Sequence, residues 1–190
     1  MRKIKQAILN SIETKLKLAN DARLLNAMDS AGRLLTGVLE RGNKILIAGN
    51  GGSAADAQHF AAELAGKFVH KRKGLAAVSL TTNSSIVTAI ANDFGYEEVF
   101  SRQLEALGTS GDVFISISTS GNSNNLVHAT EVSKDMNIYS IGLLGNNGGR
   151  IGSLCDLAII VPSLNTQAIQ ESHILIIHII CQIIDDHFAS

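Results

Sequence analysis

The sequence is poor in aromatic side chains. Aromatic residues make up only 4% of its 190 residues, and it has no tryptophan. Hydrophobic residues nevertheless account for 45% of the chain, and charged residues for only 17%. The core must therefore be built from isoleucine, leucine, valine and alanine. A chain with this much apolar surface is also expected to bury some of it between subunits.

Other absences narrow the class of protein. Cys155 and Cys181 both lie in apolar segments, which indicates reduced core residues of a cytoplasmic protein. The net charge of −1 gives no reason to expect nucleic acid or an acidic membrane as a partner. The start, Met1-Arg-Lys-Ile-Lys, lacks the apolar core of a signal peptide. No stretch reaches the ~18 uninterrupted apolar residues of a membrane span. With one proline and no linker or repeat, residues 1–190 are expected to form a single domain.

Strand and helix patterns alternate along most of the chain. Two amphipathic helices are expected in residues 1–41, either packed on the sheet or in a subunit interface, where we place them. Strands are predicted at 44–49, 75–80, 112–118, 138–144 and 157–161. Helices are predicted at 54–66, 85–92, 97–107, 125–136, 149–154 and 167–188. Buried apolar strands joined by helices predict an α/β sandwich of three layers, with a five-stranded parallel sheet between two layers of helices.

A hydroxyl-rich loop follows the third predicted strand. Ser118, Thr119, Ser120 and Ser123 supply hydroxyl donors, and Gly121 lets the backbone approach a ligand closely. The helix that follows begins with unpaired N–H groups, and its dipole favours negative charge there. These features suit a phosphate monoester, which presents three acceptor oxygens. The alternative is a loop whose serines only cap the helix and turn the chain.

A glycine-rich loop, Gly49-Asn-Gly-Gly-Ser-Ala, follows the first predicted strand. It fits the loose dinucleotide-binding pattern, which also needs an acidic residue at the end of the second strand. That strand runs instead into Leu80-Thr-Thr-Asn, without a carboxylate. No nucleotide cofactor is therefore expected, and Asn50 and Ser53 suggest hydrogen bonds to sugar hydroxyls.

Two helices carry candidate acid–base residues. His59 and Glu63 are four residues apart and so share one helix face. Apolar neighbours of Glu63 predict a partly desolvated carboxylate, whose raised pKa would suit a general base. In the last predicted helix, which is apolar almost all round, His178 stands alone among isoleucines. The alternatives are a surface pair on the first helix and a satisfied core histidine on the second.

Five motifs in this order resemble the bacterial phosphoheptose isomerases, which are built on the sugar-isomerase (SIS) fold. They are Asn50-Gly-Gly-Ser, Ala55-Asp-Ala-Gln-His-Phe-Ala-Ala-Glu, Asn92-Asp-Phe-Gly, Ser118-Thr-Ser-Gly-Asn-Ser and Ile169-Gln-Glu. The resemblance covers essentially the whole chain. It implies an aldose–ketose isomerase that converts sedoheptulose 7-phosphate to D-glycero-D-manno-heptose 7-phosphate through an enediol, towards ADP-heptose and lipopolysaccharide. It also implies a homotetramer with sites at its subunit interfaces.

The resemblance assigns a role to individual residues. Glu63 would be the base and His178 the acid. Substrate contacts would come from Asn50, Gly51, Gly52, Ser53, Glu63, Asn92, Asp93, Ser118, Thr119, Ser120, Ser123 and Gln170, with the hydroxyl-rich loop taking the phosphate. Some family members bind zinc through the residues matching His59, Glu63, Gln170 and His178. The last two are roughly 12 Å apart along a helix, so both side chains would have to lean inward to share an ion.

The chain departs from the family just before Ile169-Gln-Glu. The family usually has Thr-Ala-Arg or an acidic–arginine pair at this place, whereas this chain has Thr166-Gln-Ala. Any contact from that arginine or acid is missing. One alternative function is that of a non-catalytic SIS protein that binds the bacterial replication initiator, a group that typically lacks counterparts of Glu63 and His178. Another is a sugar-phosphate-sensing regulator, but no DNA-binding segment is recognisable. The basic run His70-Lys-Arg-Lys is expected to be a solvated loop, with attraction of an anionic substrate as the alternative.

Overall fold

Five parallel strands form the centre of this computed structural model, which describes residues 1–189. They are β1 (Ile45–Gly49), β2 (Ala77–Ser79), β3 (Val113–Ser118), β4 (Tyr139–Leu144) and β5 (Leu157–Ile160). The strand order is β2-β1-β3-β4-β5, and every neighbouring pair is parallel. The chain adds β2 on one side of β1 and β3 on the other, so the strand order reverses at β1. The loops after β1 and β3 therefore leave from adjacent strand ends, which is where ligands bind in open α/β sheets.

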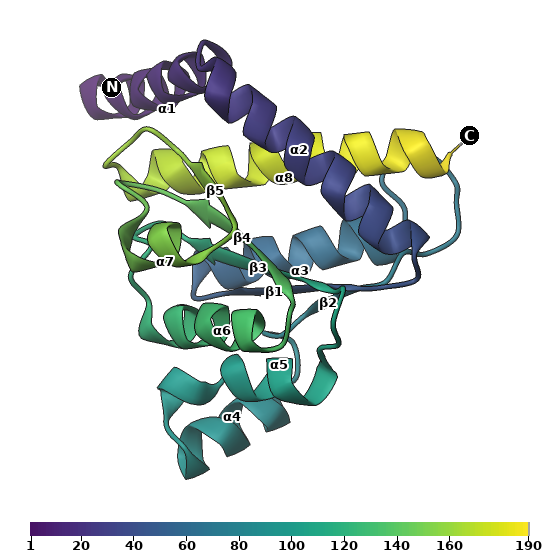
Figure 1. Ribbon diagram of the computed structural model, residues 1–190. Coiled ribbons are helices and arrows are strands. Elements are labelled where there is room, and N and C mark those ends of the chain that lie inside the picture. Colours follow the sequence, from purple (N-terminus) through teal and green to yellow (C-terminus); the bar gives the residue numbers. More distant parts are fainter. Residues whose placement is uncertain (190) are drawn as a thin grey trace.

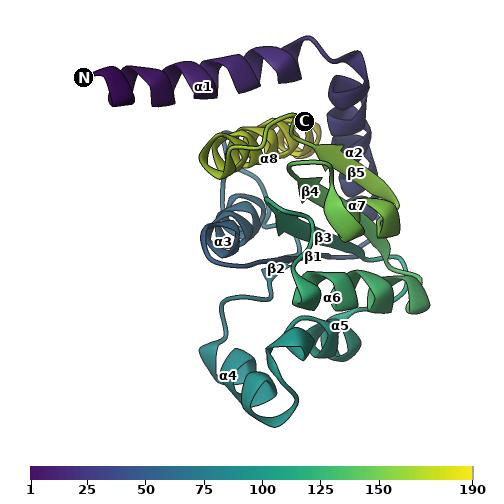
Figure 2. The ribbon, with the colours of Figure 1, turned by 90° about the vertical axis from the view of Figure 1, so that its left-hand side faces the viewer.

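Helices cover both faces of this sheet, which confirms the three-layer prediction (Figure 1; Figure 2). One layer holds α2 (Ala22–Glu40), α3 (Gly52–Ala65) and α8 (Thr166–Phe188). The other layer holds α5 (Ser101–Leu107), α6 (Asn124–Asp135) and α7 (Gly149–Leu154). The helix α4 (Ser84–Asp93) lies outside this second layer. Successive strand residues point to opposite faces. Accordingly, Ile45 and Ile47 join the core under α2, α3 and α8, whereas Leu46 and Ala48 join the core on the other face.

The N-terminal helix α1 (Arg2–Ala19) extends beyond the rest of the molecule (Figure 2). It crosses α8 and is joined to it by an ion pair. Residues spaced by four share a helix face, and Ile4, Ile8, Ile12 and Leu16 are each between 48% and 64% exposed. This stripe leaves apolar surface open to solvent in the isolated chain.

Two elements depart most from their predicted form, and the ends of the others lie within two residues of the prediction. β2 is only three residues long, against the predicted 75–80. The predicted helix 97–107 is divided into a 3₁₀ helix, η1 (Tyr96–Glu98), and α5. The Ser101 hydroxyl donates to the carbonyl of Glu98 at 3.1 Å and to its carboxylate at 2.6 Å. Such local side-chain bonds compete with helical backbone pairing, which accounts for the break.

Among residues 1–189, α8 alone is long and apolar enough to cross a membrane by length and composition. Half of its most apolar stretch is buried inside the structure, where the helix packs against α1, α2 and α3. An apolar helix buried in this way is typical of the core of a globular domain.

Candidate active site

The helices α3 and α8 run side by side and carry the predicted catalytic and metal-binding residues (Figure 2). At the start of α3, Gly52 lies directly against Gln170, since a Cβ on this glycine would be 2.1 Å from the Gln170 Nε2. About two turns later His59 meets His178, which follows Gln170 by eight residues. We call this line of contact the α3–α8 seam.

Three side chains converge in the middle of the seam. The Nε2 atoms of His59 and His178 are 2.9 Å apart, and the His59 Nε2 is 3.2 Å from the Glu63 Oε1. One ligand atom from each of the three residues lies within 4.8 Å of the others. The side chains of His59 and Glu63 remain 41% and 21% exposed. We call His59, Glu63 and His178 the open cluster, because it can hold one metal ion and is reachable from solvent.

Two buried groups flank the open cluster. Burial, followed by the charge of Glu63, raises the pKa of the Cys181 thiol to about 12, so it stays protonated at neutral pH. Asp56 lies one turn before His59 and is 7% exposed, and its Oδ2 has no hydrogen-bond partner. Burial raises the pKa of Asp56 to about 6, although the nearby His59 opposes the shift. Asp56 therefore keeps spare bonding capacity beside the cluster.

His173, one turn before the open cluster on α8, belongs to the core. Its ring is fully buried, and its Nε2 lies 3.1 Å from the carbonyl oxygen of Leu144 at the end of β4. Burial lowers the pKa of His173 to about 4, so the ring is neutral at pH 7. Its place against the sheet fits a packing role.

The hydroxyl-rich loop between β3 and α6 uses some of its hydroxyls and leaves others available. The Ser118 Oγ accepts from the Gly121 N–H at 3.0 Å, and the Ser120 Oγ accepts from the Asn122 N–H at 3.2 Å. Ser123 is the N-cap of α6, but its side chain makes no capping hydrogen bond. The Ser123 Oγ lies 3.5 Å from the Ser118 Oγ, and the first N–H groups of this twelve-residue helix remain available for an anion. The expectation that these serines only cap and turn holds for part of the loop.

Gly121 fixes this loop against the turn after β4. Its φ of +68° lies in the region that favours glycine, and a Cβ there would be 2.0 Å from the carbonyl oxygen of Gly148. The carbonyl of Thr119 also accepts a hydrogen bond from the Asn146 Nδ2 at 2.8 Å. The backbone of the loop is therefore held in place without using the side chains of Thr119 and Ser123.

The loop after β1 approaches the hydroxyl-rich loop through a pair of asparagines. The amides of Asn50 and Asn125 each donate to the other's oxygen, at 2.9 and 3.0 Å, and the Tyr96 hydroxyl donates to the Asn50 Oδ1 at 3.0 Å. The Asn50 Oδ1 thus accepts two hydrogen bonds, and its backbone carbonyl accepts another from the Ser53 N–H at 3.0 Å. Gly51, at φ +56° and ψ −120°, has a conformation that glycine adopts readily. Neither Asn125, which is buried, nor Tyr96 was singled out from the sequence.

The remaining predicted substrate contacts are more scattered. Asn92 and Asp93 are exposed at the end of α4, where the Asn92 Nδ2 donates to the Asp93 Oδ1 at 2.7 Å. Ser53, in the first turn of α3, is only 6% exposed. Gln170 is half-buried over the glycine-rich loop. The open cluster and the two loops are each assembled as groups, whereas Asn92 and Asp93 form a separate pair on an outer helix.

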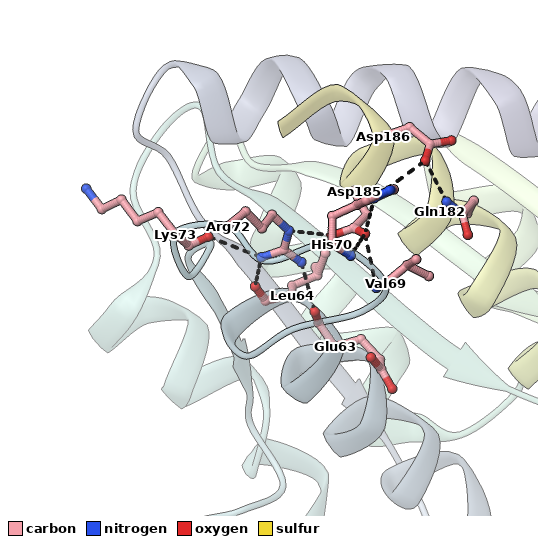
Figure 3. A network of polar contacts seen from close by, with 9 residues as sticks. All are labelled: Glu63, Leu64, Val69, His70, Arg72, Lys73, Gln182, Asp185 and Asp186. Carbon is pink, nitrogen blue, oxygen red and sulfur yellow. Dashed lines mark hydrogen bonds and ion pairs between the residues drawn. The ribbon is translucent and has the colours of Figure 1, made fainter. Parts of the chain in front are cut away.

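Arg72 departs from the solvated loop predicted for the basic run, whereas His70, Lys71 and Lys73 are exposed as predicted. The Arg72 side chain is 2% exposed and forms an ion pair with Asp185, which is fully buried, at 2.7 Å (Figure 3). The backbone N–H of His70 also donates to Asp185, at 2.8 Å. The prediction was wrong for Arg72 because a basic residue looks solvated until its acidic partner, 113 residues away in the chain, is known.

Comparison with known proteins identifies the family. The SIS domain family matches residues 9–145. A phosphoheptose isomerase of Helicobacter pylori (strain Shi470) is 59% identical over 157 residues, which cover 83% of this chain and 82% of that protein. The chain belongs to the phosphoheptose isomerase family.

Two solved structures of phosphoheptose isomerases share the whole fold. The enzyme from Neisseria gonorrhoeae is 42% identical, with a TM-score of 0.92 over 97% of this chain and 98% of that chain. The enzyme from Francisella tularensis is 37% identical, with a TM-score of 0.94 over 97% of both chains. Phosphoheptose isomerases therefore match this chain from α1 to α8, and the SIS prediction is confirmed.

Proposed function

We propose that the chain interconverts sedoheptulose 7-phosphate and D-glycero-D-manno-heptose 7-phosphate. The observation that carries this proposal is the convergence of Glu63, His59 and His178 in a phosphoheptose isomerase fold. Membership of this family and the presence of the acid–base pair favour an enzyme over the initiator-binding alternative. The product would serve ADP-heptose and lipopolysaccharide synthesis in the cytoplasm.

Aldose–ketose isomerisation needs a base and an acid on one substrate. In our mechanism Glu63 takes a proton from C1 of the ketose, and the electron pair forms the C1–C2 double bond of an enediol. His178 gives a proton to the C2 oxygen as its carbonyl bond opens. Glu63 then returns the proton to C2, while the C1 hydroxyl gives its proton back to His178 and becomes the aldehyde carbonyl. The contact between His59 and Glu63 orients the carboxylate for both transfers.

The two loops at the switch point would hold the rest of the substrate. The hydroxyls of Ser118, Thr119, Ser120 and Ser123, together with the first N–H groups of α6, would bind the phosphate. The sugar hydroxyls would be bound by Asn50, Gly51, Gly52 and Ser53, together with Asn92, Asp93 and Gln170. Because the Oδ1 and the backbone carbonyl of Asn50 already accept hydrogen bonds, its part is assigned to its N–H groups.

The open cluster fits a zinc ion. Two imidazole nitrogens and a carboxylate oxygen are a donor set that zinc takes, and all three atoms lie within 4.8 Å of one another. His59, Glu63 and His178 would hold the ion, in which state Glu63 would be a poorer base. Gln170, which lies two turns away against Gly52, would have to lean toward them to join the set. A bound zinc ion would supply Lewis-acid polarisation of a substrate oxygen.

The assembly that we propose is a homotetramer, with α1 and α8 in its interfaces. The apolar stripe of α1 and the outer residues Leu175 and Ile179 of α8, 36% and 38% exposed, support this assignment. Burial of such stripes between subunits removes apolar surface from water. Sedimentation of the purified chain tests it, because a monomer at micromolar concentration would contradict the assembly.

A substrate panel tests the function. Sedoheptulose 7-phosphate is compared with hexose and pentose phosphates, and product formation is followed by NMR. We expect the heptose phosphate to be isomerised with the highest kcat/KM. Absence of turnover with this substrate, together with capture of the replication initiator in a pull-down, would replace the proposal by the initiator-binding alternative.

A further inference from the structure

A second polar cluster lies on the α3–α8 seam beyond the open cluster (Figure 3). Asp185 follows His178 by seven residues, about two turns of α8. Its side chain is fully buried, and the Arg72 Nε donates to its Oδ1 at 2.7 Å. We call Arg72 and Asp185, with the backbone groups that they bind, the closed cluster.

Arg72 connects the closed cluster to the backbone of Glu63. Its Nη2 donates to the carbonyl oxygen of Glu63 at 2.9 Å, and its Nη1 donates to that of Leu64 at 2.9 Å. Carbonyls in the last turn of a helix have no partner within the helix, and a cation is favoured there by the dipole. Figure 3 shows the guanidinium reaching both carbonyls from the loop after α3. The turn that carries the proposed base is therefore bonded to a buried ion pair.

Asp185 connects the same loop to His178. Its Oδ2 accepts from the backbone N–H groups of Val69 at 3.1 Å and His70 at 2.8 Å, and lies 3.1 Å from the His70 Nδ1. The residue before Val69 is Phe68, whose ring packs against the ring of His178 with centroids 5.8 Å apart. One carboxylate thus holds the loop that supports the proposed acid.

We propose that Arg72 and Asp185 are positioning residues that set the separation of Glu63 and His178. They clamp the end of α3 and the loop after it to α8. Both side chains are almost completely buried, so their effect on the reaction passes through the residues that they hold. This inference rests on the proposed function, in which Glu63 and His178 act on one substrate. A displacement of about 1 Å in such a pair can lower the rate by about 100-fold.

Asp112 offers a matched control. Its carboxylate is also fully buried, with the Lys44 Nζ at 2.6 Å and the Thr109 N–H at 2.8 Å. It lies just before β3, away from the α3–α8 seam. Asp112→Asn and Asp185→Asn therefore remove the same charge from two buried, bonded sites, and only one of these sites holds the catalytic helices together.

The experiment measures kcat, KM and the affinity for Zn²⁺ at a temperature where both variants remain folded by circular dichroism. Zinc affinity is measured by competition with a chelating dye. We expect Asp185→Asn to lower kcat by about 10- to 100-fold and to weaken zinc binding by about 10-fold, with KM changed by less than about threefold. Asp112→Asn should leave kcat and zinc affinity within about twofold of wild type. Equal losses in the two variants, or wild-type values for Asp185→Asn, would overturn the proposal.

Arg72→Lys provides a second test that does not depend on the folding of Asp185→Asn. Lysine keeps the charge but lacks the planar fork that bonds Glu63, Leu64 and Asp185 together. We expect a smaller loss of kcat and zinc affinity, and full retention of both would contradict the role of Arg72. If wild-type protein fails to isomerise sedoheptulose 7-phosphate, the proposed function is wrong. The zinc affinities of the variants then decide the positioning role by themselves.

Discussion

The open and closed clusters lie along the same α3–α8 seam and are built in opposite ways. In the closed cluster, both oxygens of Asp185 are bonded, one to Arg72 and the other to two backbone N–H groups. In the open cluster, the side chains of His59 and Glu63 are partly exposed. The His59 ring contacts Glu63 and His178, which are themselves possible metal ligands. About two turns of α8 separate the fully bonded carboxylate of Asp185 from His178 in the open cluster.

The difference follows from the energetics of buried charge. A charge removed from water must be paired and hydrogen-bonded, or it is strongly destabilising. Burial alone would raise the pKa of Asp185, but hydrogen bonds from His70, Arg72 and Val69 outweigh it and hold this pKa below the ordinary value. Groups near the surface can keep spare bonding capacity at little cost. A fully hydrogen-bonded carboxylate therefore indicates the structural role of the closed cluster. Unused hydrogen-bonding capacity indicates the ligand-binding role of the open cluster.

The largest expected effect comes from removing the base of the open cluster. Glu63→Gln should lower kcat by about 100- to 10,000-fold, because a neutral amide cannot accept the carbon proton. Circular dichroism and phosphate affinity should stay unchanged, since the hydroxyl-rich loop is untouched. Glu131→Gln, at an exposed position of α6, is the control and should keep wild-type turnover. A wild-type rate in Glu63→Gln would refute the assignment of the base.

Breaking the closed cluster should affect stability instead. Arg72→Ala leaves Asp185 charged and buried and removes the donor to the Glu63 carbonyl, so we expect a loss of about 3–5 kcal/mol in the free energy of unfolding. Urea denaturation measures it. Arg33→Ala, which removes an exposed ion pair with Asp29 on α2, should leave the unfolding midpoint almost unchanged. Similar midpoints for the two variants would mean that the closed cluster is not structural.

Zinc should stabilise the protein through the open cluster alone. At a free Zn²⁺ concentration of 100 times Kd, binding to the folded state adds about 2.7 kcal/mol to the free energy of unfolding. His178→Ala removes one of three ligands and should abolish most of this gain, whereas His128→Ala on α6 should retain it. Chemical unfolding with and without Zn²⁺ checks this. Equal stabilisation of both variants would place the metal elsewhere.

Much of the fold, and the His59–Glu63 pair on the α3 side of the α3–α8 seam, could be predicted from local sequence. Buried β-branched runs indicate strands, and the two loops that follow β1 and β3 are recognisable by their glycines and hydroxyls. The i,i+4 spacing of His59 and Glu63 is also a local signal, because a helix brings such residues together whatever surrounds them. The meeting of His59 with His178 is not local, and only the family resemblance suggested it.

The closed cluster could not be predicted, because its meaning depends on contacts distant in sequence. Arg72 lies in a basic run that looks solvated, and its partner Asp185 is 113 residues away. Two asparagines, Asn50 and Asn125, are likewise paired across 75 residues. A usable signal was the place of Asp185 directly after Ile184 and one turn after Cys181, on the buried stripe of α8. A charge on such a stripe requires a partner.

The smallest expected effect compares two buried aspartates of the seam as the pH changes. The pKa of Asp185 is held below its ordinary value of 3.8, so its stabilisation is complete above about pH 4 and is lost as the pH falls further. The pKa of Asp56 is raised from 3.8 to about 6, so the folded state binds more protons than the unfolded state between these values. Wild type should therefore lose on the order of 1 kcal/mol relative to Asp56→Asn as the pH rises from about 4 to 6. Relative to Asp185→Asn, it should lose stability only as the pH falls below about 4. Denaturant unfolding of metal-free protein from pH 3 to 8 measures both differences, and slopes of the same sign would show that full hydrogen bonding does not distinguish the two carboxylates.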